Sequence, residues 1–200
     1  MLLVNHSGPP EASVRNLLLE AARTGATSLL GLFAGGLVFT VLAPSLLTLP
    51  ALAYVRHWQA LNTDYGRAMP VLLLTCLALL LVTCATSYQR GRPVFWLTVT
   101  ATLLLIAVIV LTLTALDPLN RLADSWNADR PPADWTDIRR HWWTLHTIRT
   151  AMAVLAFLAL LIANVAGRTK DEPPACPRPP GSRAPAAPPG PVADASPSRR

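Results

Sequence analysis

Residues 94–116 read VFWLTVTATLLLIAVIVLTLTAL, and this stretch decides the fold class of the chain. It contains no Asp, Glu, Lys, Arg or His. At about 1.5 Å per residue, a helix of this length spans the hydrocarbon core of a bilayer, which is about 30 Å thick. A helix also satisfies its own backbone hydrogen bonds, which lipid cannot do. The stretch is therefore predicted to be a transmembrane helix.

Three more apolar runs lie at about 26–42, 70–88 and 150–166, each near the length of a membrane span. With 94–116 they predict an all-α fold, in which residues 25–167 form a four-helix transmembrane bundle. Gly31, Gly35 and Gly36 in the first run have the small-residue spacing of closely packed membrane helices. We expect this stripe to pack against a neighbouring helix of the same chain, with homodimerisation as the alternative.

A cleaved signal peptide is the other interpretation of the first run, with Ala51-Leu52-Ala53 as its cleavage site. The segment ahead of the run contains Glu11 and Glu20 and lacks the basic start of a signal peptide. The apolar stretch also continues beyond the usual length of a signal-peptide core. We therefore expect the first span to be retained.

The composition agrees with a membrane protein. Of the 200 residues, 52% are hydrophobic and 14% are charged, whereas soluble domains have about 25% charged residues. This balance argues against a soluble enzyme and against a disulfide-stabilised secreted domain. Cys76 and Cys84 lie eight residues apart on one predicted helix and cannot pair, and with Cys176 they show no metal-ligand spacing.

The net charge of +6 is interpreted as a topology signal, not as nucleic-acid binding. If the termini and the loop 89–93 share one side, that side carries ten Lys and Arg against five acids, and the other carries seven Arg against six Asp. The positive-inside rule then places both termini in the cytoplasm of a multi-pass cell-membrane protein. Residues 1–24 are a predicted cytoplasmic segment, and residues 168–200 a predicted disordered Pro-rich tail that a protein partner could bind.

Residues able to support chemistry gather on the predicted outer side, which holds five of the six tryptophans. Residues 134–166 contain neither Gly nor Pro and predict one long helix that extends outward from the fourth span. Trp135, Trp142, His146 and Arg149 share one face of it. Arg149 either faces the bundle interior or anchors the helix at the membrane interface. His146 is either a catalytic base or an interfacial histidine without a catalytic role.

Two other outer segments converge on the same region. Trp58 and Asn62 fit one face of a short interfacial helix ahead of a span that starts at Pro70. Pro118 is expected to end the third helix and to aim Asn120 across the mouth of the bundle. Together the three segments predict a pocket for a small, largely apolar ligand.

Several kinds of site are missing from the sequence. No dinucleotide-binding or Walker motif follows a strand, and no metal-ligand cluster occurs. No histidine lies in mid-span, so a bis-histidine haem is unsupported. No acid or base lies mid-membrane, which argues against an ion pump or a proton relay.

The outer residues give the chain a resemblance to the small four-span membrane proteins with an anthrone-oxygenase-like domain. The resemblance rests on the order and spacing of four pieces across about residues 25–167. The pieces are Gly31-Leu-Phe-Ala-Gly-Gly, Trp58-Gln-Ala-Leu-Asn, Pro118-Leu-Asn-Arg-Leu and Trp142-Trp-Thr-Leu-His-Thr-Ile-Arg-Thr. The chain departs from the family at Leu116-Asp117, where Asn-Val is common, and this places an acid at the mouth.

The resemblance implies an oxidation by O2 that needs no metal, flavin or other cofactor. In the activity that names the family, an anthrone loses a proton from an acidic carbon, and the carbanion reacts with O2 to give an anthraquinone. His146 is the base in this scheme, and Arg149 stabilises the oxyanion.

The resemblance further implies that Asn120 and Asn62 assist Arg149, and that Trp142 and Trp58 stack on the flat substrate. The expected partners are then the lipid bilayer, a small aromatic substrate and O2. The alternative function is non-enzymatic: a membrane accessory or interaction protein whose outer loops and Pro-rich tail bind other proteins.

Overall fold

The structure is a computed structural model that describes residues 10–171 of the chain. Its α-helices are α1 (Pro10–Val41), α2 (Ala51–Ser87), α3 (Arg92–Leu111), α4 (Asp117–Asp124) and α5 (Trp135–Asp171). Short 3-10 turns form η1 (Pro44–Thr48) and η2 (Tyr88–Arg90), and a π-helix, η3 (Thr112–Leu116), joins α3 to α4. No strand occurs within the described residues, and the all-α prediction is confirmed.

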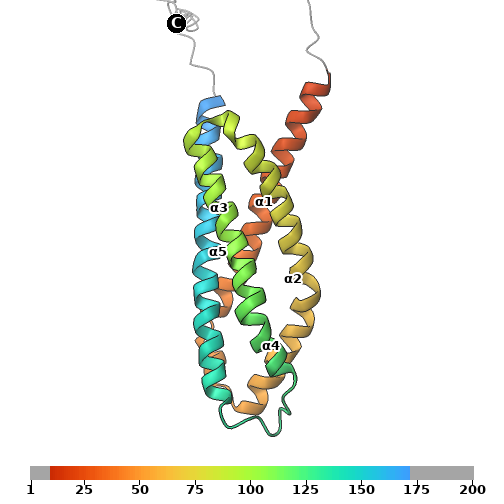
Figure 1. Ribbon diagram of the computed structural model, residues 1–200, viewed down its shortest axis with the longest axis vertical. Coiled ribbons are helices and arrows are strands. Elements are labelled where there is room, and N and C mark those ends of the chain that lie inside the picture. Colours follow the sequence, from red (N-terminus) through yellow and green to blue (C-terminus); the bar gives the residue numbers. More distant parts are fainter. Residues whose placement is uncertain (1–9, 172–200) are drawn as a thin grey trace, which may run out of the picture.

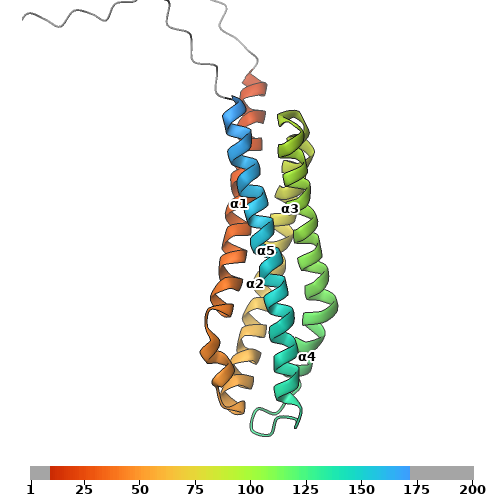
Figure 2. The ribbon, with the colours of Figure 1, turned by 90° about the vertical axis from the view of Figure 1, so that its left-hand side faces the viewer.

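The helices form an elongated antiparallel bundle (Figures 1 and 2). α1 packs against α2 and α5, and α3 packs against the same two helices. The start of α1 and the end of α5 lie at one end of the bundle (Figure 1). The opposite end holds α4 and the loops that join α1 to α2 and α4 to α5, and we call it the α4 end.

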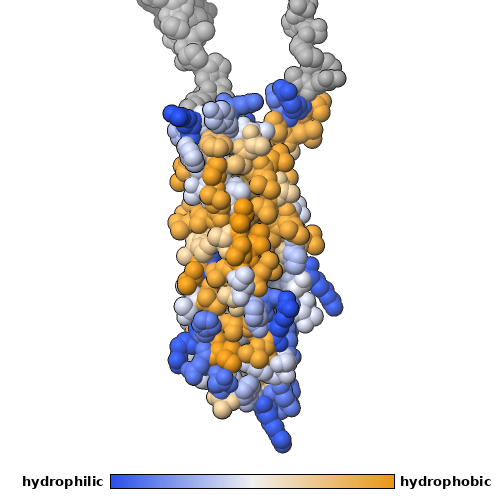
Figure 3. Space-filling model, in the orientation of Figure 1, coloured by the Kyte–Doolittle hydropathy of each residue, from blue (hydrophilic) through white to orange (hydrophobic). Residues whose placement is uncertain are grey.

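Four helical segments are long and apolar enough to cross a membrane. They are Val14–Val41, Ala51–Arg90, Arg92–Asp124 and Trp135–Gly167. On the face that Figure 3 shows, hydrophobic side chains cover the middle of the bundle and hydrophilic ones gather toward its ends. Large apolar side chains in the middle are exposed, such as Leu103 at 60%, as expected of a surface that faces lipid. The chain is therefore a multi-pass membrane protein with the predicted four-helix bundle.

The four long helices meet in an apolar interior. Each contributes a leucine without exposed surface, namely Leu30, Leu80, Leu105 and Leu160. α1 and α5 approach closely at Gly31, where a Cβ atom would lie 2.9 Å from Cε2 of Phe157. Nothing lies within 4 Å of a Cβ added at Gly35 or Gly36. The expected packing of the glycine stripe inside the chain is thus observed at Gly31.

α2 differs from the prediction, because it runs unbroken from Ala51 through Pro70 to Ser87. The expected interfacial helix and the second span are one helix. A proline inside a helix removes one hydrogen bond, and its ring crowds the carbonyl four residues earlier, which here belongs to Gly66. A glycine backbone is flexible, so the Gly66 carbonyl can tilt away from the proline ring. Buried residues on both sides of Pro70 also hold the two halves of α2 in place by packing.

The prediction that Pro118 ends the third helix is wrong. The chain stays helical from α3 through η3 and α4 as far as Asp124. A π-helix has wider turns with i→i+5 bonds, and Pro118 follows it in the first turn of α4, where a residue that has no N–H to donate is tolerated. α4 therefore prolongs the third span and brings its polar side chains between α2 and α5.

The long helix predicted to lead into the fourth span is confirmed as α5. It continues to Asp171, so the first residues of the predicted tail are helical. α1 likewise begins at Pro10, inside the predicted N-terminal segment 1–24. The rest of the predicted Pro-rich tail, residues 172–200, lies outside the described residues, and so does the partner site predicted within it.

Candidate functional site at the α4 end

Asn120 of α4 connects the helices on either side of it. Its Oδ1 atom accepts a hydrogen bond from Nε1 of Trp58 in α2 at 3.0 Å and another from Nε1 of Trp142 in α5 at 2.8 Å. An indole N–H can only donate, so a buried ring needs an acceptor. Trp58 is 4% exposed, and Asn120 supplies its acceptor. One amide oxygen thus fixes two tryptophans from distant parts of the sequence, as the predicted position of Asn120 across the mouth requires.

Asn62 and Gln59 strengthen the contact between α2 and α4. The Asn62 amide donates to the backbone oxygen of Asn120 at 3.2 Å and to Oδ1 of Asp124 at 3.0 Å. The Gln59 amide donates to the backbone oxygens of Ala123 at 2.9 Å and of Trp126 at 3.0 Å. The Ala123 carbonyl lies in the last turn of α4 and also accepts from the backbone N–H of Trp126 at 3.2 Å, and the Trp126 carbonyl lies just beyond that end of the helix. Gln59 therefore caps α4, a role that the sequence did not reveal.

Aromatic side chains fill the mouth of the bundle. The ring centroids of Trp58 and Trp142 lie 5.4 Å apart. The Arg139 guanidinium lies 5.2 Å from the ring centroid of Tyr54 and 4.6 Å from that of Trp135. A cation above aromatic faces is attracted by their quadrupoles, so Arg139 holds this part of α5 to α2.

His146 lies one turn below Trp142 on α5 and is 2% exposed. The two rings stack with centroids 4.9 Å apart and an interplanar angle of 13°. Nδ1 of His146 lies 2.8 Å from Nη2 of Arg149, and Nε2 lies 3.3 Å from the backbone oxygen of Leu37 in α1. A guanidinium has only donors, so Nδ1 must accept and Nε2 must carry the proton that it donates to Leu37. These partners define His146 as a neutral imidazole whose one lone pair faces Arg149.

Arg149 is a charged side chain held by neutral groups. Its Nη1 lies 3.5 Å from Oγ1 of Thr112, the first residue of the π-helix η3. Its Nε is buried and has no hydrogen-bond partner. Among residues 14–167, whose side chains the structure describes, no carboxylate forms an ion pair with Arg149. A partly buried cation without a counter-charge is unfavourable, so the position suits an anionic ligand oxygen.

All six predicted site residues belong to one connected network. From α2 to α5 the connection runs through Asn62, Trp58, Asn120, Trp142, His146 and Arg149. Sequence reasoning missed Leu37 and Thr112. A backbone carbonyl inside an apolar span leaves no sequence signal, and Thr112 is one of several threonines in the third span.

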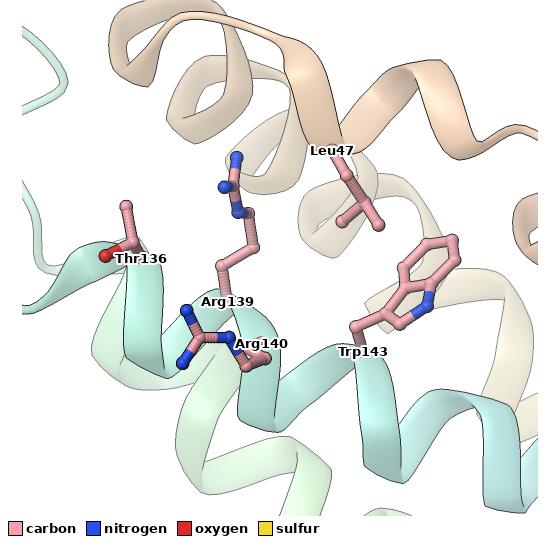
Figure 4. A pocket seen from close by; sticks show the side chains of 5 residues that line it. All are labelled: Leu47, Thr136, Arg139, Arg140 and Trp143. Atoms are coloured by element: carbon pink, nitrogen blue, oxygen red, sulfur yellow. The ribbon is translucent and has the colours of Figure 1, made fainter.

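A pocket of about 140 Å³ opens beside this network (Figure 4). It is lined by Leu47 of η1 and by Thr136, Arg139, Arg140 and Trp143 of α5. The ring of Trp143 lies between the two sites, with its centroid 6.2 Å from that of His146. None of the predicted site residues lines this pocket, so it is a separate feature of the α4 end.

Comparison with known families identifies the chain from this region. The family described as "Anthrone oxygenase" matches residues 58–159, about half of the sequence. The chain belongs to the anthrone oxygenase family. The match begins at Trp58 and encloses the complete network from Asn62 to Arg149, so the resemblance predicted from the sequence is confirmed. No curated protein and no solved structure matches the chain.

The site of this anthrone oxygenase family member contains few side chains of the kinds that bind metal ions. Within residues 10–171 no group of three or more His, Cys, Asp or Glu side chains is placed to hold a metal ion. The network instead offers a neutral imidazole, a guanidinium and indole rings. These groups are suited to moving a proton and to stabilising negative charge on a flat organic molecule.

Proposed function

We propose that the protein is a membrane-bound oxygenase that uses O2 to oxidise a small aromatic substrate at the α4 end, without a metal or flavin cofactor. The observation that carries the proposal is the contact between His146 and Arg149 inside the family-matched region. A neutral base and an unpaired cation adjoin there. Deprotonation of an acidic carbon needs both, because it creates a carbanion whose charge moves onto oxygen.

The reaction begins when Nδ1 of His146 takes a proton from an activated CH2 group of the substrate. The electron pair of the broken C–H bond delocalises into the neighbouring carbonyl, and Arg149 stabilises the resulting oxyanion. O2 is the oxidant and forms the new C–O bond at the carbanion. The carbon loses two hydrogens and becomes a carbonyl, while the second oxygen atom leaves as water.

The remaining members of the network are proposed to shape the site around this pair. Trp142 supports the imidazole by stacking and presents an aromatic edge for a flat substrate, and Trp58 supports Trp142. Asn120 and Asn62 hold these rings and α4 in place through their hydrogen bonds. In this assignment the two asparagines act through the tryptophans and need not touch the oxyanion.

The test is formation of quinone from an anthrone under O2 by the purified protein in detergent. We expect the wild type to exceed the rate without protein, and His146→Ala to lose most of that excess. General base catalysis typically contributes about 10²- to 10⁴-fold. Arg149→Ala is expected to lose a comparable share, because it removes the oxyanion partner.

Matched controls lie on the same side of the protein. His141→Ala removes an exposed histidine of α5, and Arg130→Ala removes an exposed arginine of the preceding loop. Both controls are expected to keep the wild-type rate. Equal quinone formation by all variants, at the rate without protein, would contradict the proposal and favour the non-enzymatic accessory function.

We propose in addition that both termini face the cytoplasm and that the α4 end faces outward from the cell membrane. The support is the excess of Lys and Arg in the segments at the termini end, including the loop 89–93. The proposed reaction then takes place at the outer face, where a largely apolar substrate can arrive from the bilayer.

A further inference from the structure

Neither ring nitrogen of His146 is free in the structure. Nε2–H points to the Leu37 carbonyl at 3.3 Å, and the Nδ1 lone pair is occupied by Nη2 of Arg149 at 2.8 Å. Only a lone pair can accept a proton, so the imidazole cannot act as a base while Arg149 holds Nδ1. The proposed chemistry therefore requires Arg149 to release His146 first.

Arg149 has a reason to move toward an anion. Its partners are both neutral, and the contact with Thr112 is long at 3.5 Å. Its Nε–H is buried without an acceptor. Nε–H and an Nη–H lie along one edge of a guanidinium, in the geometry that receives an anionic oxygen through two parallel hydrogen bonds. A hydrogen bond from Arg149 to a neutral oxygen is weaker than one to an anionic oxygen, so it compensates less for the loss of the bond to Nδ1.

We propose that Arg149 is a cap on the base His146 and that an anionic oxygen of the substrate removes it. The substrate class that this requires is a phenol that is ionised when it binds and still carries the activated CH2 group. The oxyanion draws the guanidinium through Nε–H and the Nη2–H on the same edge. The guanidinium turns toward the oxyanion and carries Nη2 away from Nδ1, so the bond between them breaks and the freed lone pair faces the substrate. The inference rests on the proposed function, since it specifies which substrates the same pair accepts.

The contact between Thr112 and Nη1 of Arg149 can persist while Nη2 changes its partner. The Thr112 hydroxyl donates to the backbone oxygen of Val108 at 2.8 Å, so an oxygen lone pair remains for Nη1 of Arg149. The π-helix begins at Thr112, and such irregular turns occur often at functional sites. Nη1 can stay near Thr112 while Nη2 changes partner, which limits the movement to the tip of the side chain.

The test compares 4-nitrophenolate with 4-nitroanisole, its methyl ether, which cannot ionise. Neither probe has the acidic CH2 group that the proposed oxidation needs, so binding is measured without turnover. In phosphatidylcholine nanodiscs the wild type is expected to bind the phenolate about tenfold or more tightly than the ether. Arg149→Met is expected to lose this preference, and Arg130→Met, in the loop before α5, to keep it.

The state of His146 is read by ¹⁵N NMR of protein labelled at its four histidines, with His146→Gln to assign the signal. Adding the phenolate is expected to move the Nδ1 signal downfield, as its hydrogen bond is lost, and the ether is expected to leave it in place. This measurement on the wild type decides the proposal even if Arg149→Met does not fold. An unmoved Nδ1 signal, or a preference for the phenolate that survives Arg149→Met, would overturn it.

A phospholipid phosphate is another source of anionic oxygen at a membrane boundary. Nanodiscs with phosphatidylglycerol therefore form a second arm, and we expect no movement of the Nδ1 signal before the probe is added. Movement caused by the lipid alone would overturn the assignment to a substrate oxygen. If the anthrone is oxidised but the Nδ1 signal does not move when the phenolate is added, the cap is refuted and the proposed oxidation is not. If the Nδ1 signal moves but neither His146→Ala nor Arg149→Ala changes the rate of oxidation, the proposed function is refuted and the cap is not.

Discussion

Replacing Asn120 with leucine is expected to weaken the α4 end of the bundle, because two indole N–H groups lose one shared acceptor. A buried donor without a partner costs about 1–3 kcal/mol, and this range applies to Trp58, which is 4% exposed. Trp142 is half-buried, so water replaces its bond in part and the loss is about 1 kcal/mol. The free energy of unfolding should therefore fall by about 2–4 kcal/mol.

The assay is reversible unfolding in mixed micelles with increasing SDS, followed by tryptophan fluorescence. Asn127→Leu is the matched control, because the Asn127 side chain accepts only an exposed bond from the backbone of Asp129 at 3.0 Å. It is expected to change the unfolding free energy by less than about 0.5 kcal/mol. An Asn120→Leu protein as stable as this control would refute the reasoning.

Asn120→Asp separates two roles for the same residue. A carboxylate retains acceptors for both indoles, so this variant should recover at least half of the stability that leucine loses. If the Asn120 amide donated to a substrate oxyanion, a carboxylate there would repel the substrate and abolish oxidation. Recovery of stability together with oxidation indicates that Asn120 positions the tryptophans. Recovery of stability without oxidation would contradict that role.

Three further outcomes are expected. Gln59→Leu should lower the unfolding free energy by about 1–2 kcal/mol, because the Trp126 carbonyl loses its side-chain donor and the Ala123 carbonyl loses one of its two donors; unchanged stability would contradict the capping role. Gly31→Ala should cost about 1–3 kcal/mol and be partly rescued by Phe157→Leu, since a Cβ would meet that ring; additive effects in the double variant would argue against the contact. In cells, an impermeant maleimide should label Ser125→Cys but not the native Cys176, and the reverse pattern would invert the proposed topology.

The four membrane helices were predictable because lipid imposes a simple requirement on sequence. A span must be apolar, long enough and helical, and residues 94–116 meet all three conditions without any charged residue. The face of α5 that carries Trp142, His146 and Arg149 was predictable for a similar reason. Helical spacing alone brings these three residues onto one side, and their stacking and hydrogen bond follow from it.

The two prolines show where local rules fail. Pro70 and Pro118 each predict a helix boundary, yet both lie within continuous helical segments. At Pro70 the crowded carbonyl belongs to a glycine, and packing on both sides holds the helix. Pro118 follows the π-helix and lies in the first turn of α4. Both solutions depend on neighbouring structure, so the residue pattern around each proline did not reveal them.

The hydrogen-bond partners of the site residues could not be predicted from the sequence. The six predicted residues do form one network, but the sequence gives no register between α2, α4 and α5. It therefore could not tell that Asn120 accepts from two tryptophans or that Arg149 occupies the lone pair of His146. The Leu37 carbonyl is the clearest case, since a backbone group has no residue type that identifies it.

The central claim is that His146 and Arg149 carry an oxidation that consumes O2, and the most direct test is O2 uptake by the protein in nanodiscs supplied with an anthrone. We expect the wild type and His141→Ala to consume O2 in step with quinone formation, well above the rate of empty nanodiscs. His146→Ala and Arg149→Ala should consume O2 at the rate of empty nanodiscs. Uptake by His146→Ala equal to that of the wild type would contradict the account.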